Sequence, residues 1–303
     1  MQAMFNKYIL TYPILGRSGL GNMLLPWARC YIWSKDNNIP MIAPIWNKLR
    51  IGPYIRREKD KRNYQFLFDN KRYINGTERL FYLLFYKKVN ECYKTSLSKN
   101  YISFKRKIIY FKGLQKYFNP IKGRNEEILS ELKKYTKNRY LPRKIPKEFI
   151  GIHIRRGDFS IPISDEILFS GGYNNQIKID WYISILNKIR NKLGYNIKAI
   201  IFSDAKKNEL IKISTLPNIE ISISNTAITD LLILSNASIM IASGSTFSMW
   251  ASFLGQVPCV WFPGQRRDFL IKGNSKAYLE PEINYRGYIP NELLDFCKIN
   301  GKI

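Results

Sequence analysis

The sequence predicts an α/β protein of two domains, the second built on a doubly wound, mostly parallel sheet. Three observations indicate this class. Between residues 149 and 262, short apolar runs alternate with segments of helical periodicity, and residues 7–35 have the pattern of strand, glycine turn and helix. Two prolines interrupt the segment Leu141-Pro142-Arg143-Lys144-Ile145-Pro146-Lys147, which we interpret as the interdomain linker.

In the first domain, residues 7–12 suit a buried strand, and a helix is expected from Met23 to about Lys35. A second strand is expected at residues 41–45. Between residues 47 and 122, aromatic residues and basic clusters follow no clear period, so no element is predicted there. Acidic residues in the first turn and basic residues in the last predict a helix over residues 126–139.

The second domain alternates strands with helices. Strands are expected at residues 149–155, 198–203, 219–223, 239–242 and 257–262. Helices are expected at residues 180–193, with Asp180 as N-cap, and at 205–213, 226–236 and 246–254. The predicted domains are therefore residues 1–146 and 147–285, followed by a C-terminal segment, 286–303, expected to form a helix that packs back toward the N-terminal domain.

Basic residues exceed acidic residues unevenly along the chain. The net charge is +26, and residues 1–149 hold 32 of the 49 Lys and Arg but only 10 of the 23 Asp and Glu. An anionic partner of this half, such as a membrane surface, an acidic substrate or nucleic acid, is one explanation, and solubility is the other. No nucleic-acid-binding module is recognisable, so a basic nucleic-acid-binding protein is only the alternative of a different class.

The residues that the chain lacks exclude several chemistries. It has a single histidine, His153, and four scattered cysteines without a C-x-x-C pair. This argues against structural zinc and against dithiol redox chemistry. No secretory signal is recognisable, and we expect free thiols in a cytoplasmic protein. Residues 231–265 carry no charge, but their serines, glycines and proline favour buried strands and helices over a membrane span.

The predicted strand at residues 149–155 ends in a concentrated set of functional groups. The segment is Gly151-Ile-His153-Ile-Arg155-Arg156-Gly-Asp158-Phe. Two guanidinium groups at the carboxyl end of a strand suit an anion, because arginine binds phosphate oxygens through two parallel hydrogen bonds. Alternatively, Arg155 pairs with Asp158 as a structural brace, and His153 is a hydrogen-bonded core residue.

A second anion site is predicted around residues 243–250, where a strand, a turn of small residues and a helix follow one another. Free N–H groups and hydroxyls at a helix N-terminus favour a phosphate. Ser245 or Thr246 can equally be a simple N-cap, as can Asp230 early in its own helix.

Five motifs occur in order: Gly16-x-x-Gly-x-Gly-Asn22, His153-x-Arg-Arg-Gly-Asp-Phe159, Phe202-Ser-Asp204, Thr229-Asp-Leu-Leu and Ser245-Thr-Phe-Ser-x-Trp250. In this combination the chain resembles the bacterial α-1,2-fucosyltransferases of glycosyltransferase family 11. The resemblance implies a GT-B fold, in which two Rossmann-like α/β domains face a central cleft. It also implies an enzyme that moves L-fucose from GDP-β-L-fucose to a sugar hydroxyl of a glycan.

Carried over by position, the resemblance implies that Arg155 grips the β-phosphate of the donor, supported by Arg156. His153 and Asp230 match contacts to the guanosine part. The implied donor-binding residues are His153, Arg155, Arg156, Asp204, Asp230, Ser245, Thr246, Phe247 and Ser248. The N-terminal turn, two residues longer than is usual in the family, is implied to line the substrate cleft through Gly16, Arg17, Gly19, Gly21 and Asn22.

The implied mechanism is an inverting single displacement that gives an α linkage. The chain has no Asp-x-Asp pair for a metal, so we expect neither a metal nor another cofactor. Arg155 and the turn at Ser245 would stabilise the departing diphosphate instead. The candidates for the general base are Asp158, Asp165 and Glu166.

The expected partners are a GDP-sugar donor and a glycan acceptor, free or carried on a lipid diphosphate, as in O-antigen or capsule synthesis at the inner face of the bacterial inner membrane. The charge of the first domain suits peripheral contact with an anionic membrane, and no nucleic acid is expected. A transferase of another GDP-6-deoxy sugar is the alternative function, and a noncatalytic glycan-binding protein is a weaker one.

Overall fold

The computed structural model of the 303-residue chain describes residues 9–46, 51–55, 63–91, 106–193, 197–224, 226–272 and 277–299. The chain divides into two compact units. Unit 1 comprises Met1–Arg50 and Arg62–Arg139, and unit 2 comprises Ile51–Lys61 and Tyr140–Ile303.

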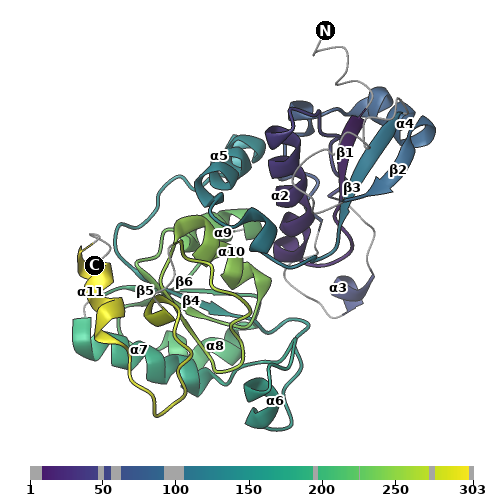
Figure 1. The fold of residues 1–303 in the computed structure, drawn as a ribbon. Helices are drawn as coiled ribbons and strands as arrows, with labels where there is room; N and C mark the ends of the chain where they lie inside the picture. Colours follow the sequence, from purple (N-terminus) through teal and green to yellow (C-terminus); the bar gives the residue numbers. More distant parts are fainter. Residues whose placement is uncertain are drawn as a thin grey trace. The chain divides into compact units, whose positions relative to one another are not determined.

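Unit 1 is built around a parallel sheet (Figure 1). Among the described residues it has three strands in the order β1-β3-β2, namely β1 (Ile9–Ile14), β2 (Lys87–Asn90) and β3 (Lys107–Lys112). The helices of at least eight residues are α2 (Leu20–Asp36), α4 (Gly76–Phe85) and α5 (Asn125–Tyr135). Short 3-10 turns lie at Asn70–Arg72, Asn119–Ile121 and Asn138–Tyr140, the last of which begins in unit 1 and ends in unit 2.

The two faces of this sheet have different covers. Side chains alternate along β1: Leu10 belongs to a core cluster with Ile108 and Tyr110, against which Tyr82 of α4 packs. Thr11 points to the other face, where its hydroxyl is hydrogen-bonded to that of Ser34 in α2. Helices α2 and α4 therefore cover opposite faces of the sheet.

Three of the sequence expectations for unit 1 need correction. Helix α2 begins at Leu20, inside the predicted glycine turn. Residues 41–45 form only single bridges, Met41 to Thr11 and Ile42 to Ile74, because the neighbouring prolines Pro40 and Pro44 have no N–H to extend a ladder. Conversely, β3 is the central strand of the sheet, although it lies within residues 47–122, for which the sequence predicts no element.

A buried ion pair joins α2 to the end of β2. The Arg29 guanidinium donates to both carboxylate oxygens of Glu91 at 3.0 Å and to the carbonyls of Lys112 and Gly113. The two side chains are only 1% and 7% exposed. One charged pair thus ties α2 to the carboxyl ends of β2 and β3.

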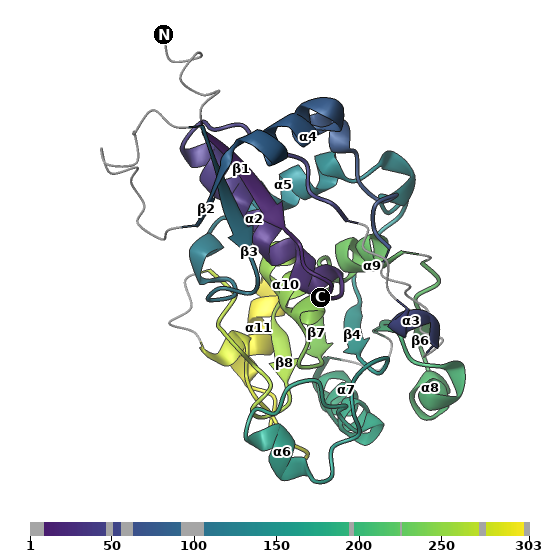
Figure 2. The same cartoon turned by 90° about the vertical axis from the view of Figure 1, so that its right-hand side faces the viewer.

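Unit 2 contains a five-stranded parallel sheet in the order β6-β5-β4-β7-β8. The strands are β4 (Ile150–Ile154), β5 (Ala199–Ser203), β6 (Ile219–Ile221), β7 (Ile239–Ala242) and β8 (Cys259–Trp261). The chain runs outward from β4 to β6 and then crosses back to β7 on the other side of β4. Figure 2 shows β4, β7 and β8 side by side. This reversal defines a doubly wound sheet with its switch point between β4 and β7.

Helices cover both faces of this sheet. Figure 1 shows α9 (Ala227–Leu234) and α10 (Thr246–Gly255) on one side and α7 (Ile179–Leu193) and α8 (Lys207–Ser214) on the other. Helix α7 begins at Ile179, so Asp180 lies in its first turn and is not the cap. The unit also contains α3 (Gly52–Ile55), α6 (Asp165–Phe169), a 3-10 turn at Ala277–Leu279 and α11 (Asn291–Ile299).

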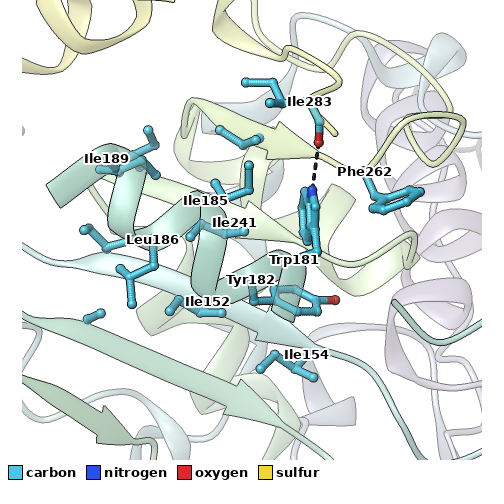
Figure 3. Packing of buried hydrophobic residues seen from close by; sticks show 14 of the residues in the cluster. Ile152, Ile154, Trp181, Tyr182, Ile185, Leu186, Ile189, Ile241, Phe262 and Ile283 are labelled. Atoms are coloured by element: carbon cyan, nitrogen blue, oxygen red, sulfur yellow. Dashed lines mark hydrogen bonds between the residues drawn. The ribbon is translucent and has the colours of Figure 1, made fainter. Parts of the chain in front are cut away.

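The core of unit 2 is closed by aromatic and aliphatic side chains from α7 and the sheet (Figure 3). The Trp181 indole donates to the Ile283 carbonyl at 2.7 Å and so fixes the segment that follows β8. The helix expected in the C-terminal segment is α11, and its Leu293, Leu294 and Cys297 pack into this same core of unit 2, whereas the expectation was that it packs toward the N-terminal domain.

The predicted α/β class with two domains is confirmed. Both units have parallel sheets, and unit 2 has the doubly wound order expected from its alternating pattern. No helix among the described residues is long and apolar enough to cross a bilayer. In the same part of the chain, Cys30, Cys259 and Cys297 are buried free thiols.

We expect Arg29→Ala to destabilise unit 1 by about 3–5 kcal/mol, because it leaves the Glu91 carboxylate buried without its partner. Thermal unfolding followed by circular dichroism measures the effect. The control is Lys35→Ala on the same helix, whose 56% exposed side chain pairs with Glu127. It should cost less than about 1 kcal/mol, and equal losses for both variants would contradict a structural role of the buried pair.

Candidate functional site

The candidate site follows from the strand order of unit 2. Strands β4, β5 and β7 are parallel neighbours, so their carboxyl ends lie at one edge of the sheet. His153 lies near the end of β4, Asp204 follows β5, and Ser243 follows β7. The switch point of such a sheet is where ligands bind.

His153 is buried in a small polar cluster between β4 and α10. Its Nδ1 lies 2.6 Å from the Ser248 hydroxyl and 2.9 Å from the Ser243 hydroxyl, and its ring stacks on Phe247 with a centroid distance of 4.9 Å. The histidine is only 5% exposed. Burial, with a smaller contribution from the nearby Arg155 charge, lowers the pKa of His153 from 6.5 to about 3. The ring is therefore neutral and joins β4, β7 and α10.

Arg155 lies just beyond β4 between two carboxylates. Its Nη1 lies 2.7 Å from Asp204 Oδ2 and its Nη2 lies 2.6 Å from Asp158 Oδ1. The Arg155 side chain is 20% exposed, Asp204 13% and Asp158 34%. Its guanidinium also faces the Phe159 ring at 5.5 Å. The structural brace between Arg155 and Asp158 is therefore present, and Asp204 reinforces it from the neighbouring strand.

Asp204 also fixes the backbone that follows β4. Its Oδ1 accepts a hydrogen bond from the Arg156 N–H at 2.7 Å. Burial is the main cause that raises the pKa of Asp204, and the Arg155 charge opposes it. Gly157 is bent at φ +23°, and a Cβ there would lie 2.2 Å from Asp204 Oδ2. The turn after β4 thus needs glycine so that the Asp204 carboxylate can reach Arg155.

The two arginines have different environments. Arg156 is buried, and its guanidinium donates to the Ile177 carbonyl at 2.9 Å. This contact holds the chain that enters α7. The structure therefore places Arg155 at the partly open edge and Arg156 inside the fold.

The N-terminus of α10 adjoins the histidine cluster. Ser245 is the N-cap and accepts a hydrogen bond from the Phe247 N–H at 3.2 Å, while Thr246 begins the first turn. Gly244 precedes them, and a Cβ there would lie 2.2 Å from the Gln265 side chain. Ser248 is fully buried and is hydrogen-bonded to His153. The capping interpretation of Ser245 is correct, and the cap stands beside the polar cluster.

Asp230 lies in the first turn of α9, where Thr226 is the N-cap. Its carboxylate accepts a hydrogen bond from the Ser222 hydroxyl, just after β6. Asp230 therefore belongs to the same edge of the sheet, two strands away from β4 in the order β6-β5-β4.

The other carboxylate candidates lie in α6. Glu166 is in its first turn, and hydrogen bonds from the Ser164 hydroxyl and its own N–H lower its pKa. Asp165 pairs with Lys178 at 3.1 Å. Of the three base candidates, the structure brings Asp158 into direct contact with Arg155.

The N-terminal glycine turn lies in unit 1, between β1 and α2. Gly16 has φ +72°, Arg17 is exposed, and Gly19 is the N-cap without a side-chain hydrogen bond. Gly21 and Asn22 are in the first turn of α2. The turn thus follows the carboxyl end of β1, as its sequence order predicts.

Three residues of this edge were not among the predicted site residues. Ser243 bonds His153, Phe159 faces Arg155, and Gln265 donates to the Leu168 carbonyl at 2.8 Å. Ser243 is the first residue after β7, so the rule that strand ends converge could have identified it. The position of Gln265 in a loop carries no comparable signal.

No group of three or more His, Cys, Asp or Glu side chains suited to a metal occurs within the described ranges.

We expect His153 to remain neutral in the folded protein from about pH 7 to about pH 5, because its pKa is lowered to about 3. The unfolded chain binds a proton near pH 6.5 that the native ring does not bind. Stability should therefore fall as the pH decreases below 6.5. The chain has one histidine, so its imidazole signals in a nitrogen-proton NMR titration need no assignment, and a midpoint near the ordinary value would contradict the burial.

Comparison with solved structures returns fucosyltransferases at low identity. The protein described as POFUT1 in complex with GDP-fucose is 15% identical with a TM-score of 0.47, covering 84% of this chain and 97% of that one. Fucosyltransferase NodZ from Bradyrhizobium is 12% identical with a TM-score of 0.45, covering 83% of this chain and 94% of that one. Among curated protein sequences, none matches this chain significantly.

The family comparison covers most of the chain. The sequence profile described as Glycosyl transferase family 11 matches residues 67–262. The match includes the segment around Arg155, the Asp204 and Asp230 positions and the N-terminus of α10. The chain belongs to glycosyl transferase family 11 and is a glycosyltransferase.

Proposed function

We propose that this glycosyltransferase moves L-fucose from GDP-β-L-fucose to a sugar hydroxyl of a glycan, with inversion and an α-1,2 linkage. One observation supports a nucleotide sugar as the donor, beyond what membership of the family shows. Arg155 is held by Asp204 and Asp158 at the carboxyl end of β4, beside the switch point of a doubly wound sheet. A guanidinium at that position suits the diphosphate of a nucleotide sugar.

The edge of the sheet suits an elongated donor. Asp230, Asp204, Arg155 and the α10 N-terminus follow four neighbouring strands, which span about 14 Å at the usual strand spacing. In our proposal the guanosine lies toward Asp230, and the diphosphate lies between Arg155 and the first turn of α10, at Ser245, Thr246 and Phe247. The N–H groups and dipole of that turn favour the negative charge.

Two of the implied donor residues act indirectly in this arrangement. His153 is a positioning residue, since its neutral ring joins Ser243 to Ser248 and stacks on Phe247. Arg156 holds the Ile177 carbonyl and so supports the turn that carries Arg155. Both residues stabilise the carboxyl edge of the sheet, and neither needs to contact the donor.

Donor binding changes the partners of Arg155. Asp204 is the more buried of the two carboxylates and also binds the Arg156 N–H. Asp158 is more exposed. We therefore infer that the β-phosphate replaces Asp158 on Arg155 while Asp204 keeps the guanidinium in place.

The displaced Asp158 is the general base in this proposal. Its displacement frees the carboxylate to accept the proton of the acceptor hydroxyl, which attacks the reacting carbon from the face opposite the diphosphate. Glu166 is the second candidate, and the hydrogen bonds that its carboxylate accepts lower its pKa. Arg155 and the first turn of α10 stabilise the charge that develops on the diphosphate, which requires no metal.

The acceptor side is assigned to unit 1. We propose that its glycine turn, from Gly16 through Arg17, Gly19 and Gly21 to Asn22, lines the substrate cleft. The acceptor is a glycan on a lipid diphosphate of the O-antigen or capsule type, handled in the cytoplasm at the inner membrane. The basic residues of the first half then favour peripheral contact with an anionic leaflet.

We expect Arg155→Ala to lower turnover about 100- to 1,000-fold, because one preorganised donor to the leaving group is lost. The assay incubates the protein with GDP-fucose and galactose-terminated acceptors and measures the mass of one added deoxyhexose. Arg143→Ala, an exposed arginine of unit 2, is the control and should retain activity. Failure of the wild type to transfer fucose, with transfer from another GDP-6-deoxy sugar, would replace the proposed donor.

Activity should persist when EDTA is added to the same assay. Loss of transfer that Mn²⁺ restores would contradict the assignment of charge stabilisation to Arg155 and the α10 turn alone.

Asp158→Asn should bind GDP at least as tightly as the wild type but lower turnover by about 100-fold or more, because it removes both the competitor on Arg155 and the base. Calorimetric titration with GDP and the transfer assay separate the two effects. Glu166→Gln should change neither strongly. Weaker GDP binding by Asp158→Asn would refute the displacement of Asp158 by the phosphate, and full turnover would return the role of base to Glu166.

A further inference from the structure

Helix α4 of unit 1 carries an apolar face that the fold does not cover. Leu80, Phe81, Leu84 and Phe85 are 60%, 46%, 75% and 66% exposed. They recur at spacings of three and four residues, so they form one continuous stripe along the helix. The Phe81 and Phe85 rings lie 5.0 Å apart.

The opposite face of α4 packs against the core of unit 1 and so anchors the helix. Tyr82 and Leu83 are partly buried and pack against the core cluster of Leu10, Ile108 and Tyr110. The helix lies beside the sheet of unit 1 in both views (Figures 1 and 2). The exposed stripe is therefore additional to what the core needs, and a cluster of large apolar side chains in water indicates an interaction surface.

Basic residues adjoin the C-terminal end of the stripe. Lys87 and Lys88 follow the helix directly and are exposed. Lys88 pairs with Ile108, whose side chain faces α4, so Lys88 lies on the α4 side of the sheet. Arg106, two residues before Ile108, is exposed and places its guanidinium 6.0 Å from the centre of the Tyr86 ring. Lys88 and Arg106 thus form a basic cluster at the C-terminal end of the stripe.

The geometry points to α4 and this basic cluster as a docking surface for an anionic phospholipid bilayer. Aromatic and leucine side chains enter the boundary between headgroups and acyl chains, while lysine and arginine bind anionic headgroups. A second copy of the chain is the other possible occupant, and the oligomeric state measured below distinguishes it from a bilayer. The inference rests on the membrane contact proposed above and names its surface.

Vesicle flotation at physiological salt tests this surface, with pure phosphatidylcholine compared with an equal mixture of phosphatidylcholine and phosphatidylglycerol. The wild type should bind the anionic vesicles only. Leu84→Ser with Phe85→Ser should weaken binding about tenfold or more through lost apolar burial. Lys88→Glu with Arg106→Glu should have an effect of similar size, since each basic residue contributes about fivefold near an anionic surface.

The controls are matched in number and exposure. Ile161→Ser with Ile163→Ser changes two side chains of unit 2 that are 80% and 96% exposed. Lys133→Glu with Lys134→Glu reverses two exposed charges on α5. Both controls should bind as the wild type does, and circular dichroism should show all variants folded.

Three other results would each refute a different part of the proposal. Wild-type-like binding by both α4 variants would refute this surface and leave the membrane contact intact. No binding of the wild type, or equal binding to neutral and anionic vesicles, would refute contact with an anionic membrane. A wild-type dimer that only the α4 apolar variant dissociates would replace the bilayer by a second copy. Transfer to a soluble acceptor, measured in parallel, tests fucosyl transfer separately.

Discussion

The reversal of strand order beside β4 is the constraint on which the site depends. The chain builds β4, β5 and β6 outward and then returns to place β7 on the other side of β4. Every strand is parallel, so segments that are separated by up to 90 residues, such as His153 and Ser243, end at the same edge. The polar residues at those ends can then bond to one another: histidine to two hydroxyls, and arginine to two carboxylates. A different crossover would leave the same residues on separate edges.

The carboxyl edge of this sheet contains a buried neutral cluster and a partly exposed charged one, and the two have different roles. The His153 cluster is enclosed and neutral, which gives β4, β7 and α10 a fixed geometry without placing a charge in the core. Arg155 is charged and partly exposed, and the less exposed Asp204 carboxylate compensates its charge. The large positive charge of the first half of the chain is not needed for this arrangement. In unit 1, at least one basic residue, Arg29, forms a buried ion pair within the fold. Other basic residues lie beside the exposed face of α4.

The sequence was most informative where the period was regular. In unit 2 the five strands and the helices α7 to α10 lie within a few residues of their predicted ranges, because buried parallel strands are continuous apolar runs that helices separate. In unit 1, β2 has the sequence Lys87-Lys88-Val89-Asn90, which shows no apolar alternation, and its pairing with β3 is a tertiary property. The site motifs were found from residue type and position after strands, whereas the pairing of Arg155 with Asp204 depends on which strands are neighbours. That information is absent from local sequence.

The contact between Gly157 and Asp204 couples two positions that are far apart in the sequence. The carboxylate occupies the space that any side chain at position 157 would need. A shorter residue at 204 would vacate that space and at the same time release Arg155 and the Arg156 N–H. The positive φ of Gly157, +23°, would still strain a side chain at that position. A change at 204 alone therefore loosens Arg155 without making room for a larger residue in the turn.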